Sequence, residues 1–268
     1  MPFLRRLAWI FVVSTALWGA PKPAILAVFA HPDDETSVGP LLARYAKEGH
    51  PVHLVSVTSG QKGVTDHAKI AAGDALAAAR NKELQCAAEK LGIAAPFLLG
   101  FQDQGISTPE MMEKVADEIR GVINRTQPDV IITWGPDGLT GHPDHRTTGN
   151  LVTQVFQQQE RLSHKPKKLY YVAFPESRFR TAPPPFNQPG ALRTVSDAFI
   201  TTEVPCTEYL PQAAAAIQCH QSQWTPERMK EISAIGEKLL EGKVFLRLAM
   251  GNGGAEVSRE NDILEGLR

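Results

Sequence analysis

The chain lacks an excess of charge of either sign, since 28 Lys and Arg residues stand against 29 Asp and Glu residues in 268. A surface without excess positive charge has little attraction for a nucleic acid backbone or for anionic lipid, so we expect no nucleic acid partner. The chain also lacks charge blocks and low-complexity tracts, and 43% of its residues are hydrophobic. This composition predicts one globular domain with a large core.

Cysteine is scarce, and the three present, Cys86, Cys206 and Cys219, form no CxxC or CxxxxH box. That spacing excludes a structural zinc finger. In an exported chain Cys206 and Cys219 could form a disulfide and leave Cys86 free, whereas the alternative is three unpaired structural thiols. The sequence leaves both alternatives open.

No apolar run at the N-terminus is long enough for a permanent membrane span. Arg5 and Arg6 precede an apolar run over residues 7–17, which is about half of the roughly 20 residues that a transmembrane helix needs. Gly19 and Ala20 follow it, so residues 1–20 have the layout of a secretory signal peptide, removed after Gly19. We therefore expect a periplasmic or secreted protein. A buried helix or an uncleaved surface anchor, with a cytoplasmic or membrane-associated protein, is the alternative.

Strand-like and helix-like segments alternate along residues 21–250. The continuous apolar run from Ala24 to Ala30 predicts a strand covered on both faces. Further strands are expected near residues 52–57, 97–99, 129–133, 168–173 and 198–204, and helices near 41–49, 73–91, 109–125, 149–160, 209–223 and 225–242. Ser107 and Glu110 have the spacing of a capping box. The alternation predicts a single α/β domain, Rossmann-like, with a mostly parallel doubly wound sheet and helices on both faces. The Gly-rich, charged segment 251–268 predicts a mobile tail.

The first motif, His31-Pro32-Asp33-Asp34-Glu35, places one imidazole and three carboxylates directly after the first predicted strand. Adjacent carboxylates raise one another's pKa unless a cation or a strong donor array lies among them. The alternative for this cluster by itself is a solvated helix N-terminus, where acidic side chains favour the helix dipole.

The second motif, His142-Pro143-Asp144-His145, lies in the loop that follows the strand predicted at residues 129–133. Ligands of open α/β sheets bind at the carboxyl ends of strands near the point where strand order reverses, and a 3-2-1-4-5 order would make the two motifs neighbours. Alone, HxxH is more often a capped helix start. Together, the motifs supply two histidines and a carboxylate and leave a position for water, which predicts a hydrolytic zinc site.

With these two motifs the sequence resembles the PIG-L and LmbE-like family of zinc-dependent de-N-acetylases. The resemblance extends from about Ile25 to Gln223 through shorter matches at residues 58–63, 80–84, 91–92, 100–103 and 220–223. It implies one zinc ion per chain and three zinc ligands: His31, Asp34 and His145. Iron or cobalt also suits two histidines and a carboxylate, so another divalent metal is an alternative.

The resemblance also implies catalytic roles for three neighbouring side chains. Asp33 would take the proton of the attacking water, and His142 would stabilise the oxygen of the amide. Asp144 would orient or tune His142. Gln61 and Gln104 stand where relatives often have Glu and Gly, so we expect the loops around the substrate to differ.

Three further residues are candidates for binding substrate: Arg80, Asp103 and His220. The alternative for Arg80 is an ion pair with Glu83 at helical spacing, and the alternative for His220 is a buried structural histidine. Gly60 and Gly63 would either let the backbone approach the substrate or form ordinary turns.

The resulting prediction is a hydrolase that removes the acetyl group from an N-acetylglucosamine-type sugar or glycoconjugate. An amidase for a larger N-acyl group and a non-catalytic sugar-binding protein of the same fold are the alternatives. A nucleotide-binding module is disfavoured, because the first loop lacks GxGxxG and its acidic side chains would repel phosphate. The sequence allows a homo-oligomer but does not indicate one.

Overall fold

The computed structural model describes residues 21–184, 186, 191–251 and 259–267 of the chain. The predicted signal peptide lies outside these residues. None of the helices in the described part of the chain combines the length and the apolar character needed to cross a bilayer.

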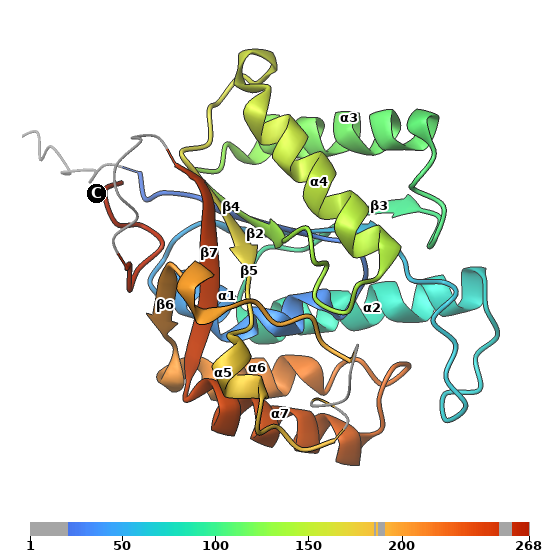
Figure 1. Cartoon of the computed structure of the whole chain (residues 1–268). Coiled ribbons are helices and arrows are strands. Elements are labelled where there is room, and N and C mark those ends of the chain that lie inside the picture. Colours follow the sequence, from blue (N-terminus) through green and yellow to red (C-terminus); the bar gives the residue numbers. More distant parts are fainter. Residues whose placement is uncertain (1–20, 185, 187–190, 252–258, 268) are drawn as a thin grey trace, which may run out of the picture.

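A seven-stranded sheet with the order β3-β2-β1-β4-β5-β7-β6 forms the centre of the molecule (Figure 1). Its strands are β1 (Ile25–Phe29), β2 (Val52–Thr58), β3 (Phe97–Phe101), β4 (Val130–Trp134), β5 (Lys168–Val172), β6 (Thr202–Pro205) and β7 (Lys243–Gly251). β1 to β5 are parallel, in the predicted 3-2-1-4-5 order, and β7 pairs antiparallel with both β5 and β6. This confirms a single, mostly parallel α/β sheet. β7 was not predicted.

Helices cover both faces of this sheet. They are α1 (Gly39–Lys47), α2 (Asp74–Leu91), α3 (Pro109–Thr126), α4 (Pro143–Gln157), α5 (Glu176–Phe179), α6 (Leu210–Ile217) and α7 (Pro226–Leu240). Alternate residues of β1 serve two cores: Ile25 packs with the buried residues of α1, α2 and α6, and Leu26 with those of α3 and α4. The layers are visible in Figure 1, with α3 and α4 above the sheet.

The N-terminal ends of two helices differ from the prediction, α3 in its capping residue and α4 in its first residue. The side chain of Thr108, not Ser107, caps α3 by accepting a hydrogen bond from the Met111 backbone N–H. Helix α4 begins at Pro143 instead of residue 149, so His142 stands at its N-cap. The second motif is therefore the first turn of a helix. The strand expected at residues 198–204 is β6, which begins only at Thr202.

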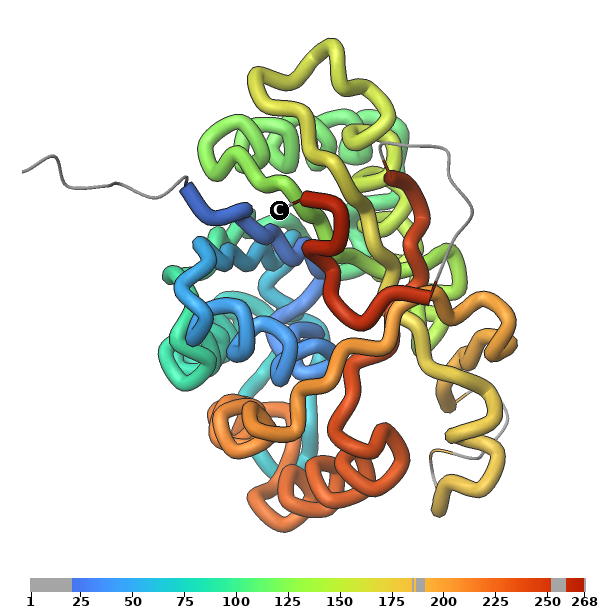
Figure 2. The backbone as a smooth tube through the Cα atoms, turned by 90° about the vertical axis from the view of Figure 1, so that its left-hand side faces the viewer, coloured from blue at the N-terminus to red at the C-terminus, as the bar shows by residue number. Residues whose placement is uncertain are grey.

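The C-terminal segment 259–267 packs against the domain (red in Figure 2), so the prediction of a mobile tail is wrong for these residues. Ile263 and Leu264 have no exposed surface. The Glu260 carboxylate accepts hydrogen bonds from Lys168 Nζ at 2.6 Å and from the Tyr170 hydroxyl at 2.5 Å. The segment's composition gave no sign of these partners, which lie about 90 residues earlier in the chain.

The disulfide joins Cys86 to Cys219, so the suggested Cys206–Cys219 bond is wrong. Cys86 lies on α2 and Cys219 just after α6, and the packing of these two helices places their Cα atoms 5.9 Å apart. Cys206 is a free, buried thiol. A pairing across 133 residues depends on helix packing, which cysteine spacing does not reveal.

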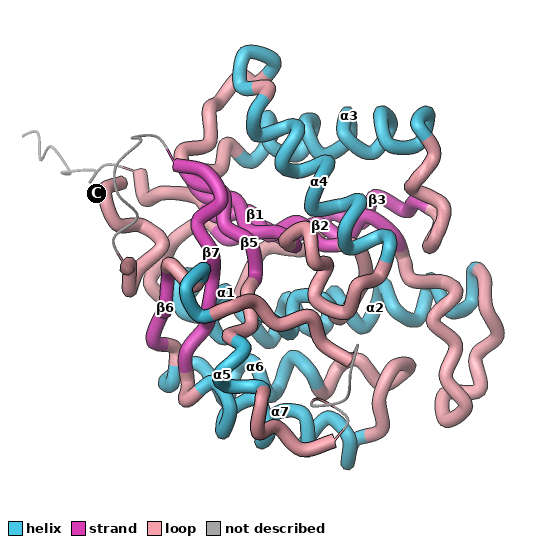
Figure 3. Tube along the Cα trace, viewed as in Figure 1, coloured by secondary structure: helices cyan, strands magenta, loops and turns pink. Residues whose placement is uncertain are grey.

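The strands β1 to β4 end on one side of the molecule, and the connections that follow them lie there (Figure 3). The loop after β2, the loop after β3 and the turn after α6 all project there. Both sequence motifs lie on this side, because one follows β1 and the other follows β4.

Candidate metal centre and active site

The two motifs meet at one cavity because β1 and β4 are hydrogen-bonded neighbours in the sheet. The cavity has a volume of about 340 Å³, which is within the usual range for small-molecule sites. It is lined by His31, Asp33, Asp34, Thr36, Ser37, Arg80, Asp103, Trp134, Leu139, Thr140, His142, His145 and Trp224.

Three donor atoms converge at the base of this cavity. His31 Nδ1 lies 3.1 Å from His145 Nε2, which lies 3.2 Å from Asp34 Oδ1. Ligand atoms about 2.0–2.1 Å from a tetrahedral zinc ion are about 3.3 Å from one another. These two distances match the spacing of ligands around one tetrahedral ion. Among the described residues, His31 also forms groups of three potential metal ligands with His142 and His145 and with Asp103 and Asp144.

A backbone carbonyl determines the tautomer of His145. Nδ1 contacts the Gly138 carbonyl oxygen at 2.9 Å and must donate to it, which leaves the lone pair on Nε2. The ring also stacks on Trp134, with centroids 4.7 Å apart and planes 9° apart. A backbone carbonyl that holds the far nitrogen is the usual support of a metal-binding histidine.

The Asp34 carboxylate has one oxygen held by the protein and the other directed at the histidines. Oδ2 accepts hydrogen bonds from the backbone N–H groups of Ala30 and His31, each at 3.0 Å, and from Trp134 Nε1 at 3.2 Å. Asp34 therefore stays ionised: burial alone would raise its pKa, but the partners, His145 foremost, hold that pKa well below the usual range.

His31 faces two further carboxylates through its other nitrogen. Nε2 lies 3.4 Å from Asp103 Oδ1 and 3.4 Å from Asp144 Oδ2. Burial opposes protonation, but Asp103, Asp144 and Asp34 outweigh it and raise the pKa of His31 to about 10. The site thus stabilises a positive charge on a buried side chain. Together with the donor spacing, this shows that the residues present fit a divalent cation.

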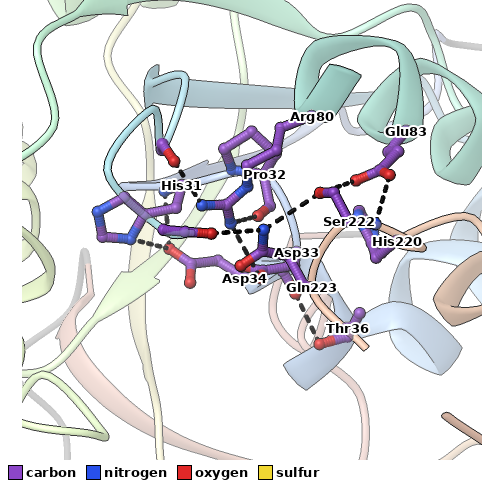
Figure 4. Close-up of polar contacts among 12 residues, drawn as sticks. His31, Pro32, Asp33, Asp34, Thr36, Arg80, Glu83, His220, Ser222 and Gln223 are labelled. Atoms are coloured by element: carbon purple, nitrogen blue, oxygen red, sulfur yellow. Dashed lines mark hydrogen bonds and ion pairs between the residues drawn. The ribbon is translucent and has the colours of Figure 1, made fainter. Parts of the chain in front are cut away.

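Asp33 has a backbone conformation that is rare for a residue with a side chain, with φ of 102°. Its backbone N–H donates to Glu35 Oε2 at 3.0 Å. Its carbonyl oxygen accepts from Thr36 Oγ1 at 2.6 Å (Figure 4). These local hydrogen bonds stabilise the strained turn. The turn directs the Asp33 carboxylate into the cavity beside the donor atoms.

Arg80 holds the Asp33 side chain and is itself 4% exposed. Its Nη2 donates to Asp33 Oδ2 at 3.0 Å and to the Pro32 carbonyl at 2.5 Å, and its Nη1 donates to the Gly60 carbonyl at 2.9 Å. The suggested Arg80–Glu83 ion pair is wrong, since the Glu83 carboxylate accepts hydrogen bonds from residue 222. Burial, opposed by Arg80, raises the pKa of Asp33 to about 6.

Gly60 and Gly63 make room for this arginine. A Cβ at Gly60 or at Gly63 would overlap the Arg80 guanidinium, and Gly60 also has a φ of +59°. The guanidinium therefore occupies the space over both glycines.

His142 has a defined tautomer and a neutral ring. Its Nδ1 accepts the Asp144 backbone N–H at 3.1 Å, so the ring proton lies on Nε2. Burial, together with His31 and His145, lowers the pKa of His142. Asp144 holds His142 through its backbone, while its carboxylate accepts the Gln104 N–H at 2.7 Å. His142 can therefore act as a neutral hydrogen-bond donor at the cavity wall.

The other two candidate substrate residues lie in different surroundings. Asp103 lines the cavity and accepts the Lys62 backbone N–H at 3.1 Å. His220 has no exposed surface, and its Nε2 lies 2.6 Å from Glu35 Oε1. The prediction that His220 contacts substrate is therefore wrong, and the alternative of a buried structural histidine describes it.

Sequence reasoning missed three residues of the site. Trp134 supports both Asp34 and His145, Trp224 lines the cavity, and Glu35 holds the Asp33 backbone. Glu35 was part of the first motif but had no assigned role. Trp134 ends β4, and its place at the carboxyl end of a central strand was a signal that could have been used.

Fold and site together define an α/β protein in which residues that could hold a cation lie in one cavity with the Asp33 carboxylate and the His142 imidazole. Residues 26–156 match the family model described as PIG-L, GlcNAc-PI de-N-acetylase. A relative from Rhodococcus opacus (strain B4), named 1D-myo-inositol 2-acetamido-2-deoxy-alpha-D-glucopyranoside deacetylase, is 31% identical over 286 residues, covering 91% of this chain and 98% of the relative. The chain belongs to the PIG-L family of de-N-acetylases.

Solved structures share the fold at lower identity. The N,N'-diacetylchitobiose deacetylase of Pyrococcus horikoshii superposes with a TM-score of 0.65 at 22% identity, covering 85% of this chain and 84% of that chain. GalB of Pseudomonas putida KT2440, a 4-carboxy-2-hydroxymuconate hydratase, also reaches 0.65, at 17% identity, covering 88% and 99%. Since a deacetylase and a hydratase have this fold, the fold alone does not determine the reaction.

Proposed function

We propose that this protein hydrolyses the acetamide of an N-acetylglucosamine-type sugar or glycoconjugate, releasing acetate and a free amine, with one zinc ion held by His31, Asp34 and His145. The observation that carries the proposal is the convergence of these three donors, 3.1 and 3.2 Å apart, beside Asp33 and His142 in one cavity. When bound, zinc supplies Lewis acidity that lowers the pKa of water from about 15.7 towards about 7.

The side chains around the site have complementary roles in this reaction. Asp33, turned into the cavity and held by Arg80, takes a proton from the attacking water. His142 donates its Nε2 proton as a hydrogen bond to the amide oxygen while negative charge develops there. Asp33 then returns its proton to the leaving amine. Asp103, 4% exposed but on the cavity wall, contacts a polar group of the sugar.

The disulfide supports the proposal that the protein acts in the periplasm or outside the cell. Disulfides persist in oxidising compartments and are rare in the cytosol. The bond between Cys86 and Cys219 thus agrees with a secretory signal in residues 1–20.

The experiment that tests the function measures acetate release from a panel of N-acetylglucosamine conjugates, before and after chelation and after zinc is restored. The Asp33→Asn variant should retain zinc but lose most turnover, because an amide cannot accept the proton. The His145→Ala variant should lose bound zinc. His145 supplies one of the converging donor atoms, whereas the Asp33 carboxylate bonds to Arg80.

Two outcomes would contradict the proposal. Full activity in a metal-free His145→Ala protein would exclude the metal mechanism. No acetate from zinc-loaded protein across the panel would favour a larger acyl group or a role in sugar binding.

A further inference from the structure

A second hollow adjoins the metal cavity. It has a volume of about 390 Å³ and shares four lining residues with that cavity: Thr36, Ser37, Leu139 and Trp224. Two of these follow Asp34 closely in the chain, and Leu139 precedes His142 by three residues. The hollow therefore opens beside the groups that the proposed reaction uses.

This hollow, which we name the apolar groove, follows helix α7, whose neighbour in Figure 1 is α6. Lining residues occur along α7 from Arg228 to Leu240, a distance of about 18 Å at 1.5 Å per residue. The groove is thus long compared with the acetamide that is cleaved.

The walls of the apolar groove are hydrocarbon surfaces that the described part of the chain covers only partly. Ile232, Ile235 and Leu239 of α7 line it and are only partly buried, and Met229 is the one residue of α7 that is buried among those described. Ala213 and Phe174 line other parts of the groove and are also partly buried. Half-covered apolar side chains around a concave surface are typical of a site for an apolar ligand.

Charged groups are few in the groove and have both signs: Arg228, Glu237 and Lys243. No cluster of one sign is present among its described residues to bind a phosphate or a carboxylate. The occupant that matches these walls is a hydrocarbon chain.

We infer that the apolar groove binds a hydrocarbon chain that the N-acetylated sugar carries as its aglycone. The inference rests on the proposed function. Because that reaction removes an acyl group of two carbons, a chain in the groove has to belong to the part of the substrate that remains. The preferred substrate is then an amphiphile, with its sugar amide at the metal and its alkyl chain along α7.

Chain length should therefore control catalytic efficiency. Burial of one methylene group contributes about 0.8 kcal/mol, which corresponds to about a fourfold change in kcat/KM for each added carbon. The increase should stop when the chain fills the groove.

The test compares kcat/KM for methyl, butyl, hexyl and octyl glycosides of N-acetylglucosamine, at concentrations where they are monomeric. Gly236→Leu should flatten the series, because Gly236 lines the groove and a Cβ there meets no atom within 4 Å, so the new side chain fits but occupies the groove. Gly121→Leu is the matched control: Gly121 lies within α3, its Cβ would also meet nothing, and it does not line the groove.

A steep series in the wild type and in Gly121→Leu that is lost in Gly236→Leu supports the inference. Equal values from methyl to octyl, or an unchanged steep series in Gly236→Leu, would overturn it while the deacetylase function stands. A steep dependence on acyl length in N-acyl glucosamines, with a flat aglycone series, would also overturn it. If no glycoside is hydrolysed, the proposed function fails. The groove is then tested by the binding of alkyl glucosides that lack an acetamide. Gly236→Leu should weaken that binding and Gly121→Leu should not.

Discussion

Replacement of Glu35 by Gln should disturb the Asp33 turn without changing any of the proposed metal ligands. The Glu35 carboxylate receives the Asp33 backbone N–H on one oxygen and lies 2.6 Å from His220 Nε2 with the other. Glu35 is 1% exposed and His220 is fully buried, so water cannot replace either partner. The substitution keeps the shape of the side chain and removes its charge.

The expected loss of unfolding free energy is about 3 kcal/mol. Breaking a buried ion pair by removing one partner costs about 3–5 kcal/mol, and one hydrogen bond to a charged group is worth about 1.5–3 kcal/mol. The lower end applies here, because His220 can give up its proton when the carboxylate is lost.

The assay combines urea denaturation with the measurement of bound metal and of kcat. We expect Glu35→Gln to lower the denaturation midpoint, to keep bound metal and to reduce kcat more than KM, since the Asp33 turn is no longer held. Glu110→Gln provides the control, because that glutamate pairs with Lys114 on the exposed surface of α3 and the same chemical change should have no measurable effect. A Glu35→Gln protein with wild-type stability and kcat would refute the reasoning.

The same pair predicts a dependence of stability on pH. Burial opposes protonation of His220, but Glu35 outweighs it and raises the pKa of His220 above 6.5. A group with a raised folded pKa contributes its full stabilisation below the unfolded value and loses it as the pH rises through the folded value. The stability difference between wild type and Glu35→Gln should therefore be largest below about pH 6.5 and should shrink at higher pH.

Three other predictions concern residues outside the metal ligands. Gly60→Ala should lower both kcat and stability, the latter by about 1–2 kcal/mol, because alanine is strained at φ of +59° and its Cβ overlaps Arg80; an unchanged denaturation curve would contradict this. Cys86→Ser should lower the melting temperature as much as reduction does, because both remove the bond to Cys219, which is worth about 5 kcal/mol in the chain-entropy model for this loop; a reductant with no effect on the melting temperature would contradict it. Cys206 should stay unmodified by a thiol reagent at pH 8 in the folded protein, since burial raises its pKa to about 12, and rapid labelling would disprove that.

Much of the site could be predicted because its parts are local in sequence. The motif from His31 to Glu35 directly follows a buried apolar strand. Such an apolar run can be recognised in the sequence without knowing which strands it pairs with. The alternation of strands and helices then determines that parallel strands end at the same edge. The first five strands and the placement of His31 next to His145 follow from these local signals.

Contacts between distant segments could not be predicted, because no local pattern encodes them. Cys86 pairs with Cys219 only because α2 packs on α6, and His220 reaches Glu35 across 185 residues. Arg80 bonds Asp33 instead of its helical neighbour Glu83 because two glycines leave space for its guanidinium.

The sequence by itself therefore determined the α/β layers and the two motifs that supply the candidate metal donors, since these depend on apolar periodicity and on residue type. Only the tertiary structure decided which hydrogen-bond partners each carboxylate has. One oxygen of Asp34 accepts hydrogen bonds from three donors. The Glu35 carboxylate bonds to a backbone N–H and to a buried histidine. A carboxylate's role depends on which donors surround it in a dry interior, and packing between distant segments sets those neighbours.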